Sequence, residues 1–234
     1  MQFAPIYPLI YRLLSPTFPS CLWSGDRDRV SIALTFDDGP HPDHTPQLLD
    51  VLDRYNLRAS FFWLGACVDR YPAIARSAYQ RGHWIGLHGY DHRSFPLLSP
   101  GELQLSLRRT QDAIARACSL DPDLIRDVRP PNGFFSPQTL QLLHQWNYRP
   151  VMWTVVPEDW VRPGIQRVVH RVLSQVDSGA IVVLHDGYCG GADVAQTTAE
   201  LIPRLLERGY SFATIDQFWD DFDRATDKNI VARF

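Results

Sequence analysis

Five short motifs in the chain contain residue types that could bind a metal ion or transfer protons. In chain order they are Asp37-Asp38-Gly39-Pro40, His88-Gly89-Tyr90-Asp91-His92, Arg129-Pro130-Pro131-Asn132-Gly133, the run from Trp153 to Trp160, and His185-Asp186-Gly187. Two imidazoles four residues apart can converge on one ion, and a carboxylate can complete such a site. A further histidine and an ionised carboxylate are suited to carrying protons in a hydrolytic reaction.

Taken singly, each motif also has a structural explanation. Asp, Gly and Pro are the residues that turns prefer, so Asp37-Asp38-Gly39-Pro40 alone predicts a turn. An H-x-x-x-H pair is weak evidence for a metal by itself, and Arg129 could belong to a structural salt bridge. A lone histidine such as His185 is more often structural than catalytic. The functional interpretation depends on the whole set, because each motif follows a predicted strand.

The elements that must position these motifs alternate between strands and helices. Strands are predicted at Ser31–Phe36, Ala59–Leu64, Trp84–Leu87, Asp127–Arg129, Pro150–Val155, Ala180–Leu184 and Phe212–Ile215. Helices are predicted from an N-cap at Thr45, at Val68–Gln80, from the capping box at Ser99, from Ser136, at Ile165–Val176 and at Val194–Glu207.

This alternation predicts an α/β fold built from about seven parallel strands, as a distorted (β/α) barrel or, alternatively, an open doubly wound sheet. We favour the barrel because polar motifs follow so many different strands. In a parallel barrel the functional groups gather at the C-terminal strand ends, so the active site is expected there.

The composition is that of an ordinary globular protein. The 234 residues suit one domain, with 45% hydrophobic and 21% charged residues. A net charge of −3 argues against a nucleic-acid partner, which would need a clustered basic surface. The four cysteines contain no C-x-x-C pair and predict buried thiols rather than a zinc knuckle. The oligomeric state is left open.

The first 29 residues are expected to form an N-terminal arm that packs on the domain or touches a membrane. Met1 to Leu14 is apolar, but Pro5 and Pro8 interrupt it and no basic cluster precedes it. The stretch is too short and too broken to span a bilayer, and it has no clear signal-peptide pattern. We therefore expect no transmembrane segment and a cytoplasmic or envelope-associated location.

The ordered set of motifs resembles the polysaccharide deacetylase family, also called the NodB-homology domain or carbohydrate esterase family 4. Thr35-Phe36-Asp37-Asp38-Gly39-Pro40 matches the first motif of that family without change. Similar stretches are Thr45-Pro46-Gln47-Leu48-Leu49, Ala59-Ser60-Phe61-Phe62 and Gly82 to His88. The resemblance covers Val30 to Trp219, so the expected division is an arm at 1–29, a deacetylase domain at 30–220 and a C-terminal tail at 221–234.

The resemblance implies a hydrolase that removes acetyl groups from the N-acetylated sugars of a chitin-like or peptidoglycan chain. It also implies one divalent metal ion held by Asp38, His88 and His92. Zinc is the expected ion, and cobalt and nickel suit the same two imidazoles and carboxylate.

Catalytic roles follow from the same resemblance. Asp37 would be the general base, Arg129 would hold it in its ionised form, and His185 would be the general acid. The residues expected to contact the substrate are Asn132, through its backbone N–H, Trp153, Asp159 and Trp160.

Three departures from the family pattern bear on substrate choice. Gly89 stands where the family has Ser or Thr, Asn132 where it has Tyr, and Val156 where it has Asp. The missing carboxylate could be supplied by Asp159 or Asp186. Three alternatives therefore remain open: an esterase of O-acetylated polysaccharide such as xylan, an amidohydrolase of small non-sugar amides, and a non-catalytic glycan-binding descendant.

Overall fold

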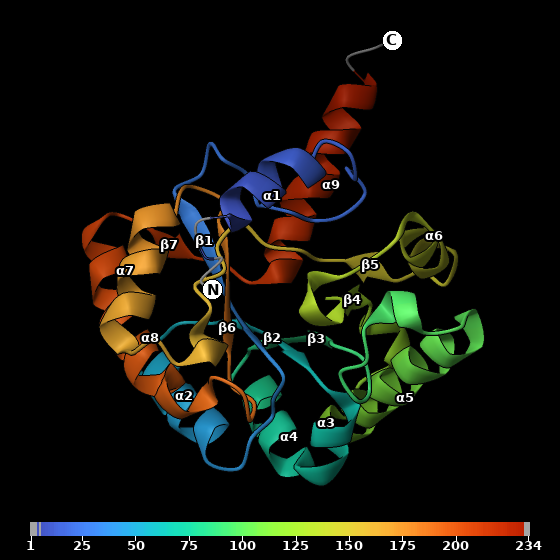
Figure 1. The fold of residues 1–234 in the computed structure, drawn as a ribbon, viewed down its shortest axis with the longest axis horizontal. Coiled ribbons are helices and arrows are strands. Elements are labelled where there is room, and N and C mark those ends of the chain that lie inside the picture. The colour runs from blue at the N-terminus through green and yellow to red at the C-terminus, as the bar shows by residue number, and fades with distance from the viewer. Residues whose placement is uncertain (1–3, 5, 232–234) are drawn as a thin grey trace.

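The structure of the protein is a computed structural model that describes residue 4 and residues 6–231. Its centre is a parallel sheet with the strand order β5-β4-β3-β2-β1-β6, and β7 also pairs with β1 (Figure 1). The strands are β1 (Ser31–Asp37), β2 (Ser60–Trp63), β3 (Trp84–Leu87), β4 (Asp127–Val128), β5 (Arg149–Pro150), β6 (Ile181–His185) and β7 (Ser211–Phe212).

The sheet curls back on itself between β5 and β6. The chain after β5 runs on to an isolated parallel bridge between Val155 and Val182, where the Val183 N–H donates to the Val155 carbonyl oxygen at 2.9 Å. The predicted long strand Pro150–Val155 is therefore wrong in extent, since only a short strand and this bridge form. The predicted fold class, a distorted parallel α/β barrel, is confirmed.

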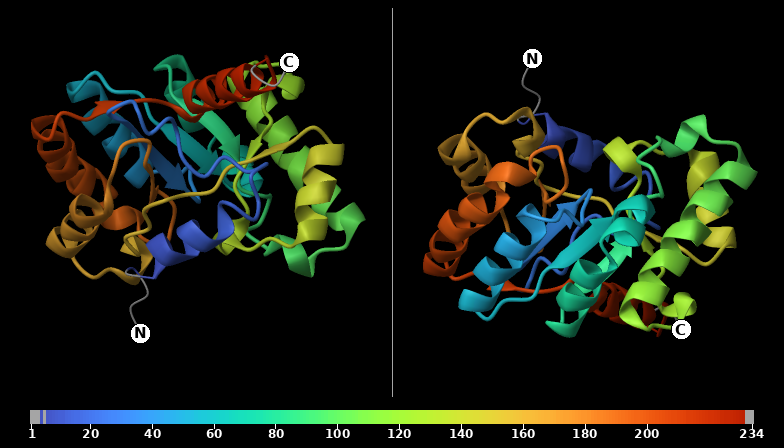
Figure 2. Two further views of the ribbon diagram at one scale, coloured as in Figure 1. Left: turned by 90° about the horizontal axis from the view of Figure 1, so that it is seen from above. Right: turned by 90° about the horizontal axis from the view of Figure 1, so that it is seen from below.

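Helices surround the strands on the outside (Figures 1 and 2). They are α2 (His44–Arg54), α3 (Gly65–Arg70), α4 (Pro72–Gln80), α5 (Pro100–Cys118), α6 (Pro137–Gln145), α7 (Ile165–Gln175) and α8 (Val194–Glu207). The Ser99 capping box at the start of α5 is confirmed, since the Ser99 hydroxyl accepts from the Glu102 N–H and the Glu102 carboxylate accepts from the Ser99 N–H. The longer helices bury an apolar face in the core, as Leu103, Leu107 and Ile114 do on α5.

Two predicted helix boundaries are wrong. The N-cap of α2 is Asp43, and Thr45 lies buried inside the first turn, where its hydroxyl donates to Asp186. The expected single helix at Val68–Gln80 is split into α3 and α4 at Tyr71, which has φ −129° and ψ 53°. The break has a local cause. A proline disfavours the α-helical region for the residue before it, and Tyr71 directly precedes Pro72.

Segments near both ends of the described chain pack against the barrel. The N-terminal segment contains α1 (Tyr7–Leu14), whose Tyr7 ring meets the Trp153 ring edge-on at 5.3 Å, and Leu22 forms a parallel bridge to Val151. The segment expected as an arm therefore packs against the chain that follows β5, at Val151 and Trp153. Towards the other end β7 stops at Phe212, short of the predicted strand end at Ile215. The helix α9 (Ile215–Val231) then includes most of the expected tail, whose residues 232–234 lie outside the described part. Among the described residues, no helix has the length and hydropathy needed to cross a membrane.

Candidate active site

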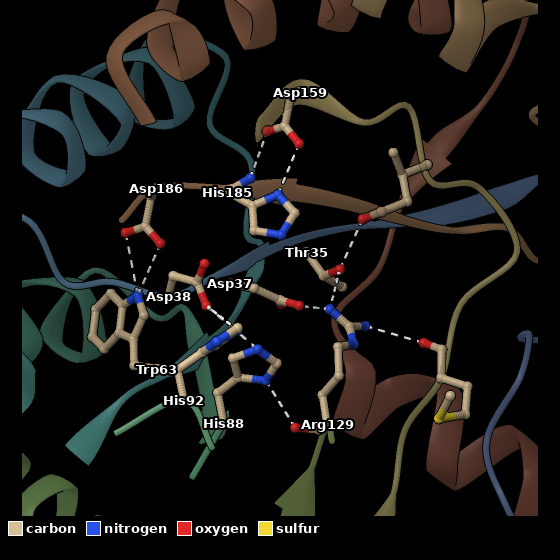
Figure 3. Close-up of polar contacts among 12 residues, drawn as sticks. Thr35, Asp37, Asp38, Trp63, His88, His92, Arg129, Asp159, His185 and Asp186 are labelled. Atoms are coloured by element: carbon tan, nitrogen blue, oxygen red, sulfur yellow. Dashed lines mark hydrogen bonds and ion pairs between the residues drawn. The ribbon is translucent and has the colours of Figure 1, made fainter. Parts of the chain in front are cut away.

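The five polar motifs converge at the C-terminal ends of the strands (Figure 3). Asp37 ends β1, His88 follows β3, and Arg129 follows β4. Asp159 opens a short 3-10 turn after β5, and His185 ends β6. Parallel strands place their carboxyl ends on one face of a barrel, and this topology brings together side chains from positions 37 to 185.

Asp38, His88 and His92 form a compact group of metal-ligating side chains. One donor atom from each lies within 4.8 Å of the other two. Asp38 Oδ1 is 3.4 Å from His88 Nε2 and 3.3 Å from His92 Nε2. The same oxygen is buried and accepts no hydrogen bond, which would be costly for a carboxylate unless a cation stands beside it.

The orientation of His88 also fits a metal ligand. Its Nδ1 lies 2.8 Å from the Arg129 carbonyl oxygen, which can only accept, so Nδ1 carries the proton and the Nε2 lone pair faces Asp38. Burial lowers the pKa of His88, which favours the neutral imidazole that a metal requires. The Asp38 oxygen has no hydrogen bond, and the His88 Nε2 lone pair points towards it. Together these two features fit a divalent cation at this position.

The loop between the two histidines is shaped by Gly89. This residue has φ +78°, and a β-carbon there would lie 3.2 Å from the Phe95 ring. The departure from Ser or Thr thus coincides with a backbone conformation that favours glycine. A hydroxyl from α5 contacts the loop nearby, since Ser106 Oγ accepts from the Tyr90 N–H at 2.9 Å.

Asp37 is a buried carboxylate, 3% exposed, and Arg129 is its charged partner. Arg129 Nη1 donates to Asp37 Oδ1 at 2.7 Å and to the Thr35 hydroxyl at 2.7 Å. Arg129 Nη2 donates to the Met152 carbonyl oxygen at 3.1 Å, and the guanidinium lies 4.1 Å from the centre of the Phe62 ring. The guanidinium is therefore fixed in place beside the Asp37 carboxylate.

His185 is held by the carboxylate of Asp159. Asp159 Oδ1 lies 2.7 Å from His185 Nδ1, and Asp159 Oδ2 accepts from the His185 N–H at 2.8 Å (Figure 3). Burial lowers the pKa of His185, but the charge and hydrogen bond of Asp159, together with the charges of Asp38 and Asp37, outweigh burial and raise the pKa to about 10. The imidazole is therefore protonated near neutral pH, as a general acid must be.

The positions of Asp159 and Asp186 decide which carboxylate takes the place of the family residue lost at Val156. Asp159 contacts His185, whereas Asp186 accepts from the Thr45 hydroxyl at 2.5 Å and from the Trp63 indole N–H at 3.2 Å. Burial raises the pKa of Asp186 to about 7. Asp159, expected at the substrate, therefore lies behind the general acid instead.

The other three residues expected at the substrate lie in different environments. Asn132 is exposed, has φ 59°, and donates from its side chain to Ser94 Oγ at 3.0 Å. Trp153 is 8% exposed and packs edge-on against Tyr7, so most of its surface belongs to the core. The Trp160 ring is half-buried and meets the His185 ring at 5.0 Å, so it borders the catalytic group.

Three residues of the site have no predicted role in it, although Thr35 and Thr45 lie in stretches that resemble the family. Thr35, Thr45 and Trp63 hydrogen bond to Arg129 or Asp186, yet each lies inside a strand or helix. The sequence predicts Thr35 inside a strand and Thr45 at a helix N-cap.

Comparison with known proteins agrees with this geometry. The polysaccharide deacetylase model matches residues 24–151, more than half of the chain. A peptidoglycan-N-acetylglucosamine deacetylase of Bacillus cereus is 34% identical over 214 residues, covering 89% of this chain and 97% of that protein. A chitooligosaccharide deacetylase of Azorhizobium caulinodans is 33% identical over 197 residues, covering 79% and 92%.

Solved structures extend the likeness to the fold. A crystal structure of a peptidoglycan N-acetylglucosamine deacetylase aligns with a TM-score of 0.81 at 27% identity, covering 85% of this chain and 92% of that one. A carbohydrate esterase family 4 pseudoenzyme from Bacillus anthracis aligns with a TM-score of 0.78 at 25% identity, covering 85% and 68%. The predicted family is confirmed: the chain belongs to the polysaccharide deacetylase family.

Proposed function

We propose that the chain is a metal-dependent deacetylase that hydrolyses N-acetyl groups on the sugars of a chitin-like or peptidoglycan glycan. One observation supports this above others. The buried base Asp37, the protonated acid His185 and the metal-ligating trio of Asp38, His88 and His92 meet at one mouth of the barrel. A fold shared with a pseudoenzyme does not by itself imply turnover, so the proposal rests on these side chains.

A divalent ion held by Asp38, His88 and His92 would polarise the acetyl carbonyl and make water more acidic. Asp37 accepts the proton of the attacking water, and Arg129 holds that carboxylate in position with a hydrogen bond. The backbone N–H of Asn132 is the proposed donor to the oxygen of the tetrahedral intermediate, a role typically worth about 3 kcal/mol.

His185 completes the reaction at the leaving group. The water oxygen bonds to the carbonyl carbon, the C–N bond breaks, and the sugar nitrogen leaves with a proton from His185 Nε2. Acetate and a free amino sugar are the products. Asp159 holds Nδ1, so the ring presents Nε2 to the mouth and stays charged until that step.

The Asp159–His185 pair favours an amide substrate over an ester. An amine is a far poorer leaving group than an alcohol, so amide hydrolysis depends more on a proton donor. His185 is such a donor. Its protonated imidazole and its backbone N–H both donate hydrogen bonds to the Asp159 carboxylate. This arrangement is our reason for ranking N-deacetylation above the esterase alternative.

The test is acetate release from a panel of substrates. The protein is loaded in turn with zinc, cobalt and nickel, and each form is assayed on chitooligosaccharides, peptidoglycan fragments and acetylated xylan. We expect release from an N-acetylated substrate, and His185→Gln should impair that release more than any release from xylan. Release from xylan alone would overturn the proposal in favour of an esterase.

A further inference from the structure

Tyr188 lies on the rim of the active site and has no part in the chemistry above. It follows His185-Asp186-Gly187 and is 53% exposed. The loop around it runs along the mouth of the barrel. A β-carbon at Gly187 would lie 2.5 Å from Cβ of Asp38, and one at Gly190 would lie 3.3 Å from Oδ2 of Asp159. Tyr188 is therefore anchored between the metal-ligating side and the general-acid side of the site.

The Tyr188 side chain is held in place although much of it is exposed. Its ring packs edge-on against the His41 ring, with centroids 4.5 Å apart and planes at 81°. Its hydroxyl lies 3.3 Å from the hydroxyl of Tyr71, at the junction of α3 and α4. Groups from two other segments thus fix one exposed aromatic ring.

The His41 side chain that packs against Tyr188 is itself held in place. His41 is 7% exposed and stacks on His44 with centroids 3.7 Å apart and planes at 11°. His41 Nδ1 accepts from the backbone N–H groups of Asp43 and His44 at 3.2 and 3.3 Å. An aromatic side chain on such a base loses little conformational freedom when it binds a ligand.

The chemistry of this surface suits a sugar ring. The half-exposed Tyr188 ring offers apolar area on the loop that follows His185, and the hydroxyls of Tyr188 and Tyr71 beside it can donate or accept hydrogen bonds. A pyranose presents a matching combination, with C–H groups on its flat face and hydroxyls around its edge. Ligand sites commonly combine apolar walls with a few placed polar groups in this way.

We propose that Tyr188, supported by Tyr71, binds a sugar neighbouring the one that is deacetylated, so that the enzyme prefers glycan chains longer than a disaccharide. This inference rests on the proposed function, since it adds a binding site to the same reaction.

The experiment compares kcat/KM on the N-acetylated chitin disaccharide and tetrasaccharide. For Tyr188→Ala we expect the ratio of tetrasaccharide to disaccharide kcat/KM to fall about tenfold, mainly through KM. Tyr188→Phe keeps the ring and should retain most of the ratio. Tyr79→Ala is the matched control, because Tyr79 is an exposed tyrosine on α4, and its ratio should equal that of the wild type.

Two outcomes would overturn the proposal. An equal loss on both lengths in Tyr188→Ala would mean that the side chain only supports the loop, and an unchanged ratio would mean that no sugar binds there. If the wild type releases no acetate from either length, the proposed function fails instead. Titration calorimetry of the metal-loaded wild type and Tyr188→Ala with the tetrasaccharide then decides the binding site alone, with weaker binding to the variant expected.

Discussion

The carboxylate of Asp159 accepts both from the ring Nδ1 and from the backbone N–H of His185, at 2.7 and 2.8 Å. This contact fixes which ring nitrogen faces the substrate. It also supplies a negative charge behind the imidazole at the point where the family pattern has lost one, at Val156.

Asp159→Asn should weaken the general acid without removing it. Loss of the charge lowers the pKa of His185 from its raised value of about 10, so the alkaline limb of the pH profile of kcat should move to lower pH. We expect kcat near neutral pH to fall about 10²-fold, at the low end of what a positioned acid contributes. His185→Gln should lose that limb altogether, and an unshifted limb in Asp159→Asn would refute the pairing.

The buried pair of Arg129 and Asp37 should be costly to break. Arg129→Met leaves the Asp37 carboxylate buried without its cation, so the free energy of unfolding should fall by about 3–5 kcal/mol in urea titrations. Arg116→Met is the control, because the Arg116–Asp69 pair is exposed and its loss should cost about 1 kcal/mol or less. Equal losses in the two variants would contradict the buried-pair account.

Metal binding should stabilise the fold through Asp38, His88 and His92. At a free zinc concentration of about 100 times the dissociation constant, the gain in unfolding free energy is about 2.7 kcal/mol, seen as a higher Tm. Asp38→Asn should remove most of this gain. His170→Ala, an exposed histidine of α7, should keep it. A full gain in Asp38→Asn would place the ion elsewhere.

His83 should make the protein sensitive to mild acid. Burial lowers the pKa of its imidazole from 6.5 to about 4, so the unfolded chain binds more protons than the folded one between these pH values. The contribution of the buried, neutral His83 imidazole to the free energy of unfolding is complete above pH 6.5. It is lost as the pH falls towards 4, by about 3 kcal/mol. His83→Gln should flatten this part of the stability curve, and an unchanged slope would exclude His83 as its source.

Much of the site could be predicted because the fold is regular. Once strands are assigned before Asp37, His88, Arg129 and His185, a parallel barrel leaves one face on which these side chains can meet. Family resemblance then separated their roles, which spacing alone could not do.

The misplaced elements reflect contacts that are not local in sequence. Thr before Pro predicts a helix cap at Thr45, but the Thr45 hydroxyl donates to Asp186, 141 residues later in the chain. Asp159 was expected at the substrate, and only the approach of β6 places it behind His185. At Tyr71, by contrast, the break was visible in the sequence as the following proline, and helical periodicity outweighed it in the prediction.

The most direct test of the central claim is acetate release from an N-acetylated chitooligosaccharide by the zinc-loaded wild type and by Asp37→Asn. We expect clear release by the wild type and a loss of about 10²–10⁴-fold in the variant, with zinc stabilisation retained because Asp37 is not in the ligand trio. Wild-type activity in Asp37→Asn, or no release by a wild type that binds zinc, would contradict the account.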